Sequence, residues 1–420
     1  MVGCGSAVDR RAVDDLQTNH PDVFNMLLLA LQGVQSITED NDLSWYQVSG
    51  IHGYPFVPWQ EDPSFVPANS NRGYCTHSSS IFTTWHRPYL VLLEQLLCDQ
   101  ARSIAQEFQG ADAAKYQAAA TEVRIPYWDW SSTSTQSRIP AAVKQDSISV
   151  NAPTGQTTIA NPLFSYKFRS PQPSDSGLGT QTIRGSSDDQ LAASFNSRRQ
   201  STLNLFTDSA YNQFSGDLEN IHNNIHVQIG GNMVYVPRSA FDPIFFLHHA
   251  NVDRLTAMYQ ASHPGVTLTP QARSQTFALG GAGPDDLDTL LYPFRHPDLK
   301  QWTSNDVANA ESIFTYGYSY PEVPQGLSTQ DLQSFATQKV NELYAPQSAA
   351  PAQAKFFSGT QSGVPDSKSK IGAFFLIPLG LTCDYSTNRT PGMDCQRTSL
   401  KHRADWFTPY PILHWRGSVE

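Results

Sequence analysis

Six histidines, arranged in two sets of three, are the residues of this chain best suited to do chemistry. The two sets are His52, His77 and His86, and His222, His226 and His249. Neutral imidazole is a suitable ligand for copper, zinc, iron or nickel. Three imidazoles leave a first-row metal ion open to a further ligand from outside. Two such sites that face each other could therefore bind a diatomic molecule between them.

The second set has the spacing of a helix-borne metal site. His222 and His226 are four residues apart in LENIHNNIHVQIGG, which on a helix puts both rings on one face, about 5–6 Å apart at Cβ. His249 follows in FDPIFFLHHANVDR, where the Phe-Phe-Leu run predicts dry surroundings. The spacing leaves open whether His248 or His249 joins the site. For the bare HxxxH pattern, two histidines on a polar helix face are the simpler interpretation.

The first set is spread over two expected helices and a loop. His86 lies near the start of the helix expected over residues 82–108, and His77 precedes it in the loop segment GYCTHSSS. His52 follows the end of a helix expected over residues 43–49. Each of them alone could be an ordinary hydrogen-bonded side chain. Together, beside clusters of Trp, Phe and Tyr, the six histidines favour a site.

The residue types of the two sets narrow the choice of metal. Zinc accepts three histidines, so a zinc hydrolase is an alternative, but the HEXXH pattern that carries a general base is absent from the sequence. Magnesium, manganese and paired iron ions prefer oxygen ligands, and these motifs offer no bridging carboxylate. Copper is the metal that fits best.

The composition is that of a globular protein, and the net charge argues against nucleic acid and anionic membranes as partners. The chain has 420 residues, 39% of them hydrophobic and 16% charged, with a net charge of −10. An acidic chain of this kind is not expected to bind nucleic acid or an anionic membrane. No apolar run reaches the roughly 18 residues of a membrane span.

The ends of the chain and its cysteines bear on location. The first residues, MVGCGSAVDRR, lack the apolar core of a signal peptide, so either the protein is intracellular or a leader has been removed. The sequon Asn388-Arg-Thr390 is weak support for secretion. Five cysteines are too few for a disulfide scaffold. Cys98 is expected to be a buried thiol, and Cys383 and Cys395 could pair.

Periodicity predicts several helices joined by long loops. Helices are expected over residues 21–37, 43–49, 82–108, 203–230, 245–262 and 327–343, and loops over 131–200 and 264–300. The fourth helix is expected to break near Ser215-Gly216. Asp253 and Arg254, which follow the last histidines, are interpreted as structural residues that orient helices through an ion pair.

The chain resembles the type 3 copper family, which contains tyrosinases, catechol oxidases and the oxygen-binding domains of molluscan hemocyanins. The matching segments are, in order, GIHGYPFVPW, CTH, TTWHRPYLVLLEQ, RIPYWDW, LENIHNNIHVQIGGNM, DPIFFLHHANVDR and FTYGYSYPE. The details are most similar to short-form fungal tyrosinases and catechol oxidases. The resemblance implies a mainly α fold, in which a central four-helix bundle holds a dinuclear copper site amid long loops and few short strands. It implies a catalytic domain over residues 1–322 and a C-terminal extension over 323–420, with a linker and a possible shortened lid.

Carried over position by position, the resemblance assigns three ligands to each copper ion: His52, His77 and His86 to copper A, and His222, His226 and His249 to copper B. The family uses the second histidine of the HH pair, which leaves His248 outside. The resemblance also implies a thioether between Cys75 and His77, which would lock that imidazole in place. An ordinary buried thiol is the alternative.

Four further residues acquire expected roles from the resemblance. Glu219 and Asn223 would hold a water that takes the phenol proton, as in general base catalysis, or would simply orient His222. Val227 and Val236 would lie at the substrate entrance, where Val236 occupies the gate position above copper A.

The expected activity is that of a polyphenol oxidase. It would contain two copper ions, use O2 as co-substrate, oxidise o-diphenols to o-quinones and also hydroxylate monophenols at the ortho position. A catechol oxidase without monophenol activity and a hemocyanin-like oxygen carrier are the alternatives. Small phenols are the expected partners, with no nucleic acid or membrane, and the oligomeric state stays open. Family habit favours an extracellular protein whose leader is missing here, although an intracellular location also stays open.

Overall fold

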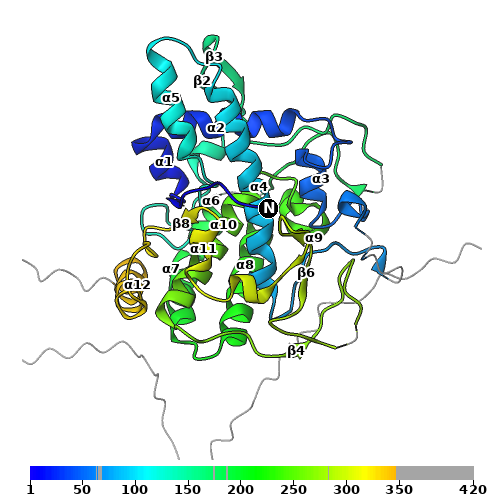
Figure 1. The fold of residues 1–420 in the computed structure, drawn as a ribbon, viewed down its shortest axis with the longest axis vertical. Coiled ribbons are helices and arrows are strands. Elements are labelled where there is room, and N and C mark those ends of the chain that lie inside the picture. The colour runs from blue at the N-terminus through cyan, green and yellow to red at the C-terminus, as the bar shows by residue number, and fades with distance from the viewer. Residues whose placement is uncertain (63, 65–68, 174–175, 186–187, 282, 347–420) are drawn as a thin grey trace, which may run out of the picture. The chain divides into compact units, whose positions relative to one another are not determined.

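Helices dominate the fold, and long loops and short strand pairs connect them (Figure 1). The computed structural model describes residues 1–62, 64, 69–173, 176–185, 188–281 and 283–346. The described α-helices are α1 Val13–Asn19, α2 Pro21–Ser36, α3 Trp45–Gly50, α4 Phe82–Ala105, α5 Ala111–Thr121, α6 Asp188–Ala193, α7 Phe195–Asn204, α8 Tyr211–Ile229, α9 Val236–Ser239, α10 Ile244–Ser262, α11 Ser312–Thr315 and α12 Thr329–Tyr344. The described strands form two-stranded pairs: β1 Val8–Asp9 with β8 Tyr318–Ser319, β2 Ser147–Ala152 with β3 Gly155–Ala160, β4 Gln271–Ala272 with β5 Pro284–Asp285, and β6 Leu290–Arg295 with β7 Gln301–Thr303. Among these described helices, none is both long enough and apolar enough to cross a bilayer.

Four long helices form the core that carries the histidines. Helix α4 packs against α2, α8 and α10, and α8 also packs against α10. Every residue of α10 is buried, as expected for a helix enclosed on all sides. Helix α2 starts at Pro21, whose fixed φ suits the first turn, and buries Val23 through Leu31. The predicted mainly α fold with a central four-helix bundle is confirmed.

A buried ion-pair network joins α4 to α10. Asp253 of α10 accepts a hydrogen bond from Arg87 Nε at 2.6 Å and another from Arg10 Nη1 at 3.0 Å. Arg10 Nε also donates to Glu94 of α4 at 2.7 Å, and the Tyr320 hydroxyl donates to Asp253 at 2.8 Å. Burial alone would raise the pKa of Asp253, but the guanidinium groups of Arg87 and Arg10 hold that pKa below its usual value. The carboxylate is therefore charged and fully paired.

The neighbouring Arg254 makes a separate network. Its guanidinium donates to Glu322 at 2.6 Å and to Asp129 at 3.2 Å. The Tyr344 hydroxyl of α12 donates to the same Asp129 carboxylate at 3.0 Å. Asp253 and Arg254 are thus structural, as predicted, but each pairs with other residues rather than with the other.

The contacts of α12 place it with the helical core. This helix packs against α10 and α7, and it belongs to the same compact unit as the N-terminal residues. The C-terminal extension was expected to begin after Glu322 and so to include the helix over 327–343. The packing instead continues beyond Glu322, because buried Leu332, Ala336 and Val340 face the core.

Two predictions of secondary structure are wrong. Helix α8 runs through Ser215-Gly216 without a break, and the interruption lies earlier, between Leu205 and Ala210. Gly216 costs a helix about 1 kcal/mol relative to Ala, which the burial of Phe214 and Leu218 offsets. Residues 131–200 contain the β2–β3 hairpin and helices α6 and α7 rather than loops alone. β2 does show the alternation of a strand, because Ile148, Val150 and Ala152 are less exposed than the polar residues between them. The prediction of loops followed the Ser- and Thr-rich composition and overlooked this pattern.

Cys98 is not a free thiol, because it forms a disulfide with Cys4, with a Cα–Cα distance of 5.9 Å. Its burial on α4 was predicted correctly, since it is 0% exposed. The N-terminal segment crosses α4 at this point, and the Val2 N–H donates to Gln95 at 2.8 Å. Sequence spacing carries no information on this pairing. Cys383 and Cys395 lie outside the described residues.

Removing the charge of Asp253 should strongly destabilise the fold. The Asp253→Asn substitution removes the counter-charge of buried Arg87 and one of the two carboxylates that contact Arg10, the other being Glu94. Breaking a buried ion pair in this way typically costs about 3–5 kcal/mol. We expect a matching loss in the free energy of unfolding measured by urea titration. Glu342→Gln removes an exposed charge that pairs with Lys339 on α12 and serves as the control. Equal urea midpoints for the two variants would contradict a supporting role for the network.

Candidate metal centre

The structure brings both predicted sets of histidines together at the centre of the bundle. His52 follows α3, His77 lies in the loop before α4, and His86 is on α4. His77 is half-buried and the other five histidines are buried. The ring centroids of the first set are 5.3 Å (His52–His77), 5.7 Å (His52–His86) and 5.5 Å (His77–His86) apart.

The second set is equally close and faces the first. The ring centroids of His222 and His226 on α8 are 4.4 Å apart, and that of His249 on α10 is 4.7 Å from His222. Between the sets, the rings of His86 and His249 stack at 4.4 Å. The six rings therefore form one cluster made of two triads.

Hydrogen bonds at Nδ1 decide which ring nitrogen is free. Three imidazoles bond to backbone carbonyl oxygens: His52 to Val236 at 2.8 Å, His86 to Phe82 at 2.8 Å, and His226 to Met233 at 2.7 Å. A carbonyl can only accept, so each Nδ1 carries the proton and each Nε2 keeps its lone pair. The Nε2 atoms of His52 and His86 are buried without a hydrogen-bond partner among the described residues. Such lone pairs fit the ligands of a metal ion.

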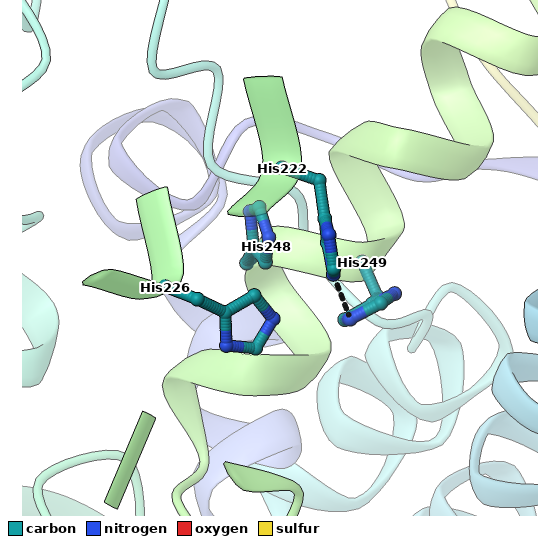
Figure 2. Close-up of side chains that lie close together, drawn as sticks. All are labelled: His222, His226, His248 and His249. Atoms are coloured by element: carbon teal, nitrogen blue, oxygen red, sulfur yellow. Dashed lines mark hydrogen bonds between the residues drawn. The ribbon is translucent and has the colours of Figure 1, made fainter. Parts of the chain in front are cut away.

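In the second triad His222 shows the same preference, whereas Nδ1 of His249 is buried without a hydrogen-bond partner among the described residues. His222 Nδ1 lies 3.1 Å from Asn223 Oδ1. Its Nε2 points at Nε2 of His249 at 3.1 Å (Figure 2). Two converging imidazole nitrogens are the donor set that copper or zinc accepts. The chemistry of the residues present therefore fits a metal ion in each triad.

The proton position also separates His248 from His249. All four histidines of Figure 2 have ligand nitrogens within 4.8 Å of one another, so distance alone does not choose. The Trp130 indole N–H, which can only donate, bonds to Nδ1 of His248 at 3.1 Å. A neutral His248 must then carry its own proton on Nε2, which leaves no lone pair for a metal. His249 has no such constraint.

Burial keeps all these imidazoles neutral. It is the largest cause that lowers the pKa of His77 to about 3 and that of His226 to about 4. The pKa values of His52, His86, His222 and His249 are lowered further by burial and then by neighbouring histidines. Neutral imidazole is the form that binds metals, so no proton must be displaced near pH 7.

Cys75 lies where a bond to His77 could form. The thiol is buried and free, and its Sγ is within 4.8 Å of ligand atoms of both His52 and His77. Burial raises the pKa of the Cys75 thiol well above its usual value, so the sulfur is protonated. A protonated, buried thiol is unreactive towards ordinary electrophiles.

Glu219 connects α8 to the loop of His77. Both of its carboxylate oxygens accept the Ser78 N–H, at 2.7 and 3.0 Å. Burial raises the pKa of Glu219 to about 7, against the effect of that hydrogen bond. Ser78 has a positive φ of 52° directly after the ligand, a conformation that costs energy and often occurs at functional sites. Asn223 contacts His222, as its orienting role requires.

The two valines predicted to lie at the substrate entrance are exposed apolar side chains. Val227 is 63% exposed and Val236 is 45% exposed. Val234 and Tyr235, on the same short segment as Val236, are also exposed. Both predicted entrance residues are thus exposed beside a histidine of the site. Val227 directly follows His226, and the carbonyl of Val236 bonds to His52.

Several groups of the site could not be found from residue types. They include the backbone carbonyls of Met233 and Val236 and the backbone N–H of Ser78. Because every residue carries these backbone groups, the sequence does not show which of them contact the site. Trp130 lies in the quoted RIPYWDW segment, so its motif was visible but its bond to His248 was not.

Comparisons with known proteins agree on one family. The family model described as the common central domain of tyrosinase matches residues 42–262. The chain is 36% identical to a tyrosinase of Podospora anserina over 384 residues, covering 81% of this chain and 67% of that protein. It is 37% identical to a tyrosinase of Neurospora crassa over 387 residues, covering 81% and 56%.

A solved structure gives the same result. Recombinant mushroom tyrosinase superposes with a TM-score of 0.76 at 28% sequence identity, over 84% of this chain and 70% of that one. The chain thus spans 67% and 56% of the two fungal relatives, and both histidine triads lie inside the matched central domain. From its matched domain, its relatives and its fold, the chain belongs to the tyrosinase family of type 3 copper polyphenol oxidases.

Proposed function

We propose that this protein is a polyphenol oxidase with two copper ions, which uses O2 to oxidise o-diphenols to o-quinones and to hydroxylate monophenols. The observation that carries the proposal is the pair of facing triads of neutral, buried imidazoles. In three of them a carbonyl oxygen holds the proton on Nδ1. Zinc would suit one triad, but two adjoining triads without a bridging carboxylate favour copper.

The proposed ligands divide by triad: His52, His77 and His86 for copper A, and His222, His226 and His249 for copper B. Two copper ions bound there would supply the electron transfer between phenol and O2. The chain itself supplies neutral ligands, a dry surrounding and fixed ring orientations. His248 stays outside the site because Trp130 occupies its Nδ1.

The substrate entrance is proposed at Val227 and Val236. Exposed apolar side chains at the mouth of a site suit a flat, uncharged phenol ring. An exposed entrance also favours an enzyme over an oxygen carrier, which must keep phenols out.

Glu219 is proposed to accept the phenol proton, directly or through a water shared with Asn223. A carboxyl with a pKa of about 7 is suited to this task, because its two protonation states are both populated near neutral pH. The Ser78 N–H holds the carboxylate in place. Asn223 contributes by orienting His222.

Two wider proposals concern location and the chain after the core. The Cys4–Cys98 disulfide is typical of proteins that fold in an oxidising compartment, which supports secretion.

A lid function for part of residues 323–420 remains a prediction, and residues 347–420 lie outside the described residues. Activity assays of the full chain before and after limited proteolysis would test the lid, and unchanged activity would reject it.

The function is tested by copper content and turnover together. The purified full chain should bind about two copper ions per molecule in preference to zinc, as two three-histidine sites require. Hydrogen peroxide should then produce a strong near-ultraviolet absorption band, and oxygen consumption should follow addition of 4-tert-butylcatechol and tyramine.

Controls for this experiment come from the two adjacent histidines. His249→Ala should lose one copper ion and all turnover, whereas His248→Asn should keep both copper ions. Binding of copper without turnover of either phenol would favour the oxygen carrier. Turnover of the catechol alone would favour a catechol oxidase, and zinc in place of copper would reject the proposal.

Glu219→Gln should separate the two activities. Loss of a general base typically costs about 100-fold or more in rate, so tyramine hydroxylation should fall by that factor while catechol turnover changes little. In the unchanged protein, hydroxylation should rise with pH through about 7, because the carboxylate form is then more populated. Equal losses of both activities would show that Glu219 acts only by holding the His77 loop.

The proposed thioether between Cys75 and His77 can be read from a mass spectrum. Trypsin should release residues 73–102, since Pro88 protects the bond after Arg87. Formation of the C–S bond removes the thiol hydrogen and a ring hydrogen with two electrons, which O2 accepts to give hydrogen peroxide. After copper loading in air, reduction and alkylation, only one of the two cysteines in this peptide should be alkylated, and the peptide should be lighter by two hydrogen atoms. Cys75→Ala provides the reference peptide. Alkylation of both cysteines would contradict the cross-link.

A further inference from the structure

One short loop contacts a ligand of each triad. This loop, residues 230–237, runs from the end of α8 into the first turn of α9 and places the Met233 carbonyl on His226 Nδ1 at 2.7 Å. Three residues later, the Val236 carbonyl bonds to His52 Nδ1 at 2.8 Å. His226 and His52 belong to different triads. By contrast, His86 bonds to a carbonyl of its own helix, so its orientation does not depend on this loop.

Backbone hydrogen bonds, more than side-chain packing, hold this loop, and one of them runs from the Tyr54 N–H to the Pro237 carbonyl at 2.9 Å. The side chains of Val234, Tyr235 and Val236 are between 40% and 54% exposed, so they contribute little packing. Met233 is buried and anchors the middle of the loop. Packing of the exposed side chains therefore restrains the loop little, and its position depends on hydrogen bonds to other segments.

Asn232 supplies one such restraint through a two-way clamp on Ile183. Its side-chain Oδ1 accepts the Ile183 N–H at 2.8 Å, and its own N–H donates to the Ile183 carbonyl at 2.9 Å. Asn232 is only 4% exposed, whereas the Ile183 side chain is 61% exposed. The clamp thus acts through backbone groups of residue 183 and not through packing of its side chain.

The backbone at Gly231 shows how tight this contact is. Gly231 has a φ of +59°, and a Cβ added there would lie 2.0 Å from the Ile183 carbonyl oxygen. Any larger residue would push the loop away from Ile183. The close approach of the loop to Ile183 therefore requires a glycine at position 231, next to Asn232.

We propose that Asn232 is a positioning residue for both copper sites, because it holds the loop whose carbonyls orient His226 and His52. This inference rests on the proposed function, since it concerns the same six ligands. A bond from Nδ1–H to a carbonyl fixes the ring and increases the basicity of Nε2. Loss of the clamp would let both carbonyls shift, and both metal ions would then be held less tightly.

The test measures release of copper from the full-length, copper-loaded protein to a Cu(I) chelator. Loss of a group that orients ligands typically weakens metal binding by about 10-fold or more, so Asn232→Ala should release both copper ions at least that much faster. Asn232→Asp keeps an oxygen that accepts the Ile183 N–H and should restore slow release. The near-ultraviolet band after addition of hydrogen peroxide gives a second readout.

Asn25→Ala is the matched control. Asn25 is also buried, and its amide bonds to both backbone groups of Asn151, at 2.7 and 2.9 Å, far from the histidines in sequence. This variant should lose stability without a change in copper release. If Asn232→Ala does not fold, Gly231→Ala opens the same contact and should show the same accelerated release.

The outcomes separate the two proposals. If the unchanged protein binds no copper, the proposed function fails. If it binds two copper ions but Asn232→Ala releases them no faster than Asn25→Ala, the role of Asn232 is rejected. Faster release of only one ion would show that the loop serves a single site, which also contradicts the inference.

Discussion

The buried ion pair between Arg87 and Asp253 is the interaction on which the geometry of the site depends. Arg87 directly follows His86 on α4, and Asp253 lies one turn beyond His249 on α10. Their 2.6 Å contact therefore joins the helices that carry one ligand of each triad, where the two rings stack at 4.4 Å. The pair is buried in a network that also includes Arg10 and Tyr320. Any shift of one helix would therefore separate charges in a medium of low dielectric constant.

Metal binding by histidine also depends on which ring nitrogen carries the proton. Hydrogen bonds from each ring to its neighbours determine this. Carbonyl oxygens keep the protons of His52, His86 and His226 on Nδ1, while the indole of Trp130 has the opposite effect on His248. Trp130 thus fixes the tautomer of His248, whereas Nδ1 of the adjacent His249 has no hydrogen-bond partner among the described residues. Burial adds to this selection, since it disfavours the charged imidazolium form at every position.

Much of the framework was predictable because it depends on local patterns. The repeat of apolar residues at three and four marked α2, α4, α10 and α12 within a few residues of their observed bounds. The spacing of His222 and His226 placed them on one helix face for the same reason. Prediction failed where tertiary packing overrides local preference, as at Gly216 within α8. It also failed in β2, where a Ser- and Thr-rich composition concealed the alternation of Ile148 and Val150 with polar residues.

The sequence by itself determined which residue types could bind a metal, which helices would carry them and which family they resemble. Only the tertiary structure decided that Cys98 pairs with Cys4, that α12 packs on the core, and that the Trp130 indole bonds to Nδ1 of His248. It also placed two carbonyls of one loop on Nδ1 of His226 and of His52. The reason is physical: helical periodicity arises between residues three or four apart, whereas tautomers, disulfides and ion pairs arise between groups that meet only after the chain has folded.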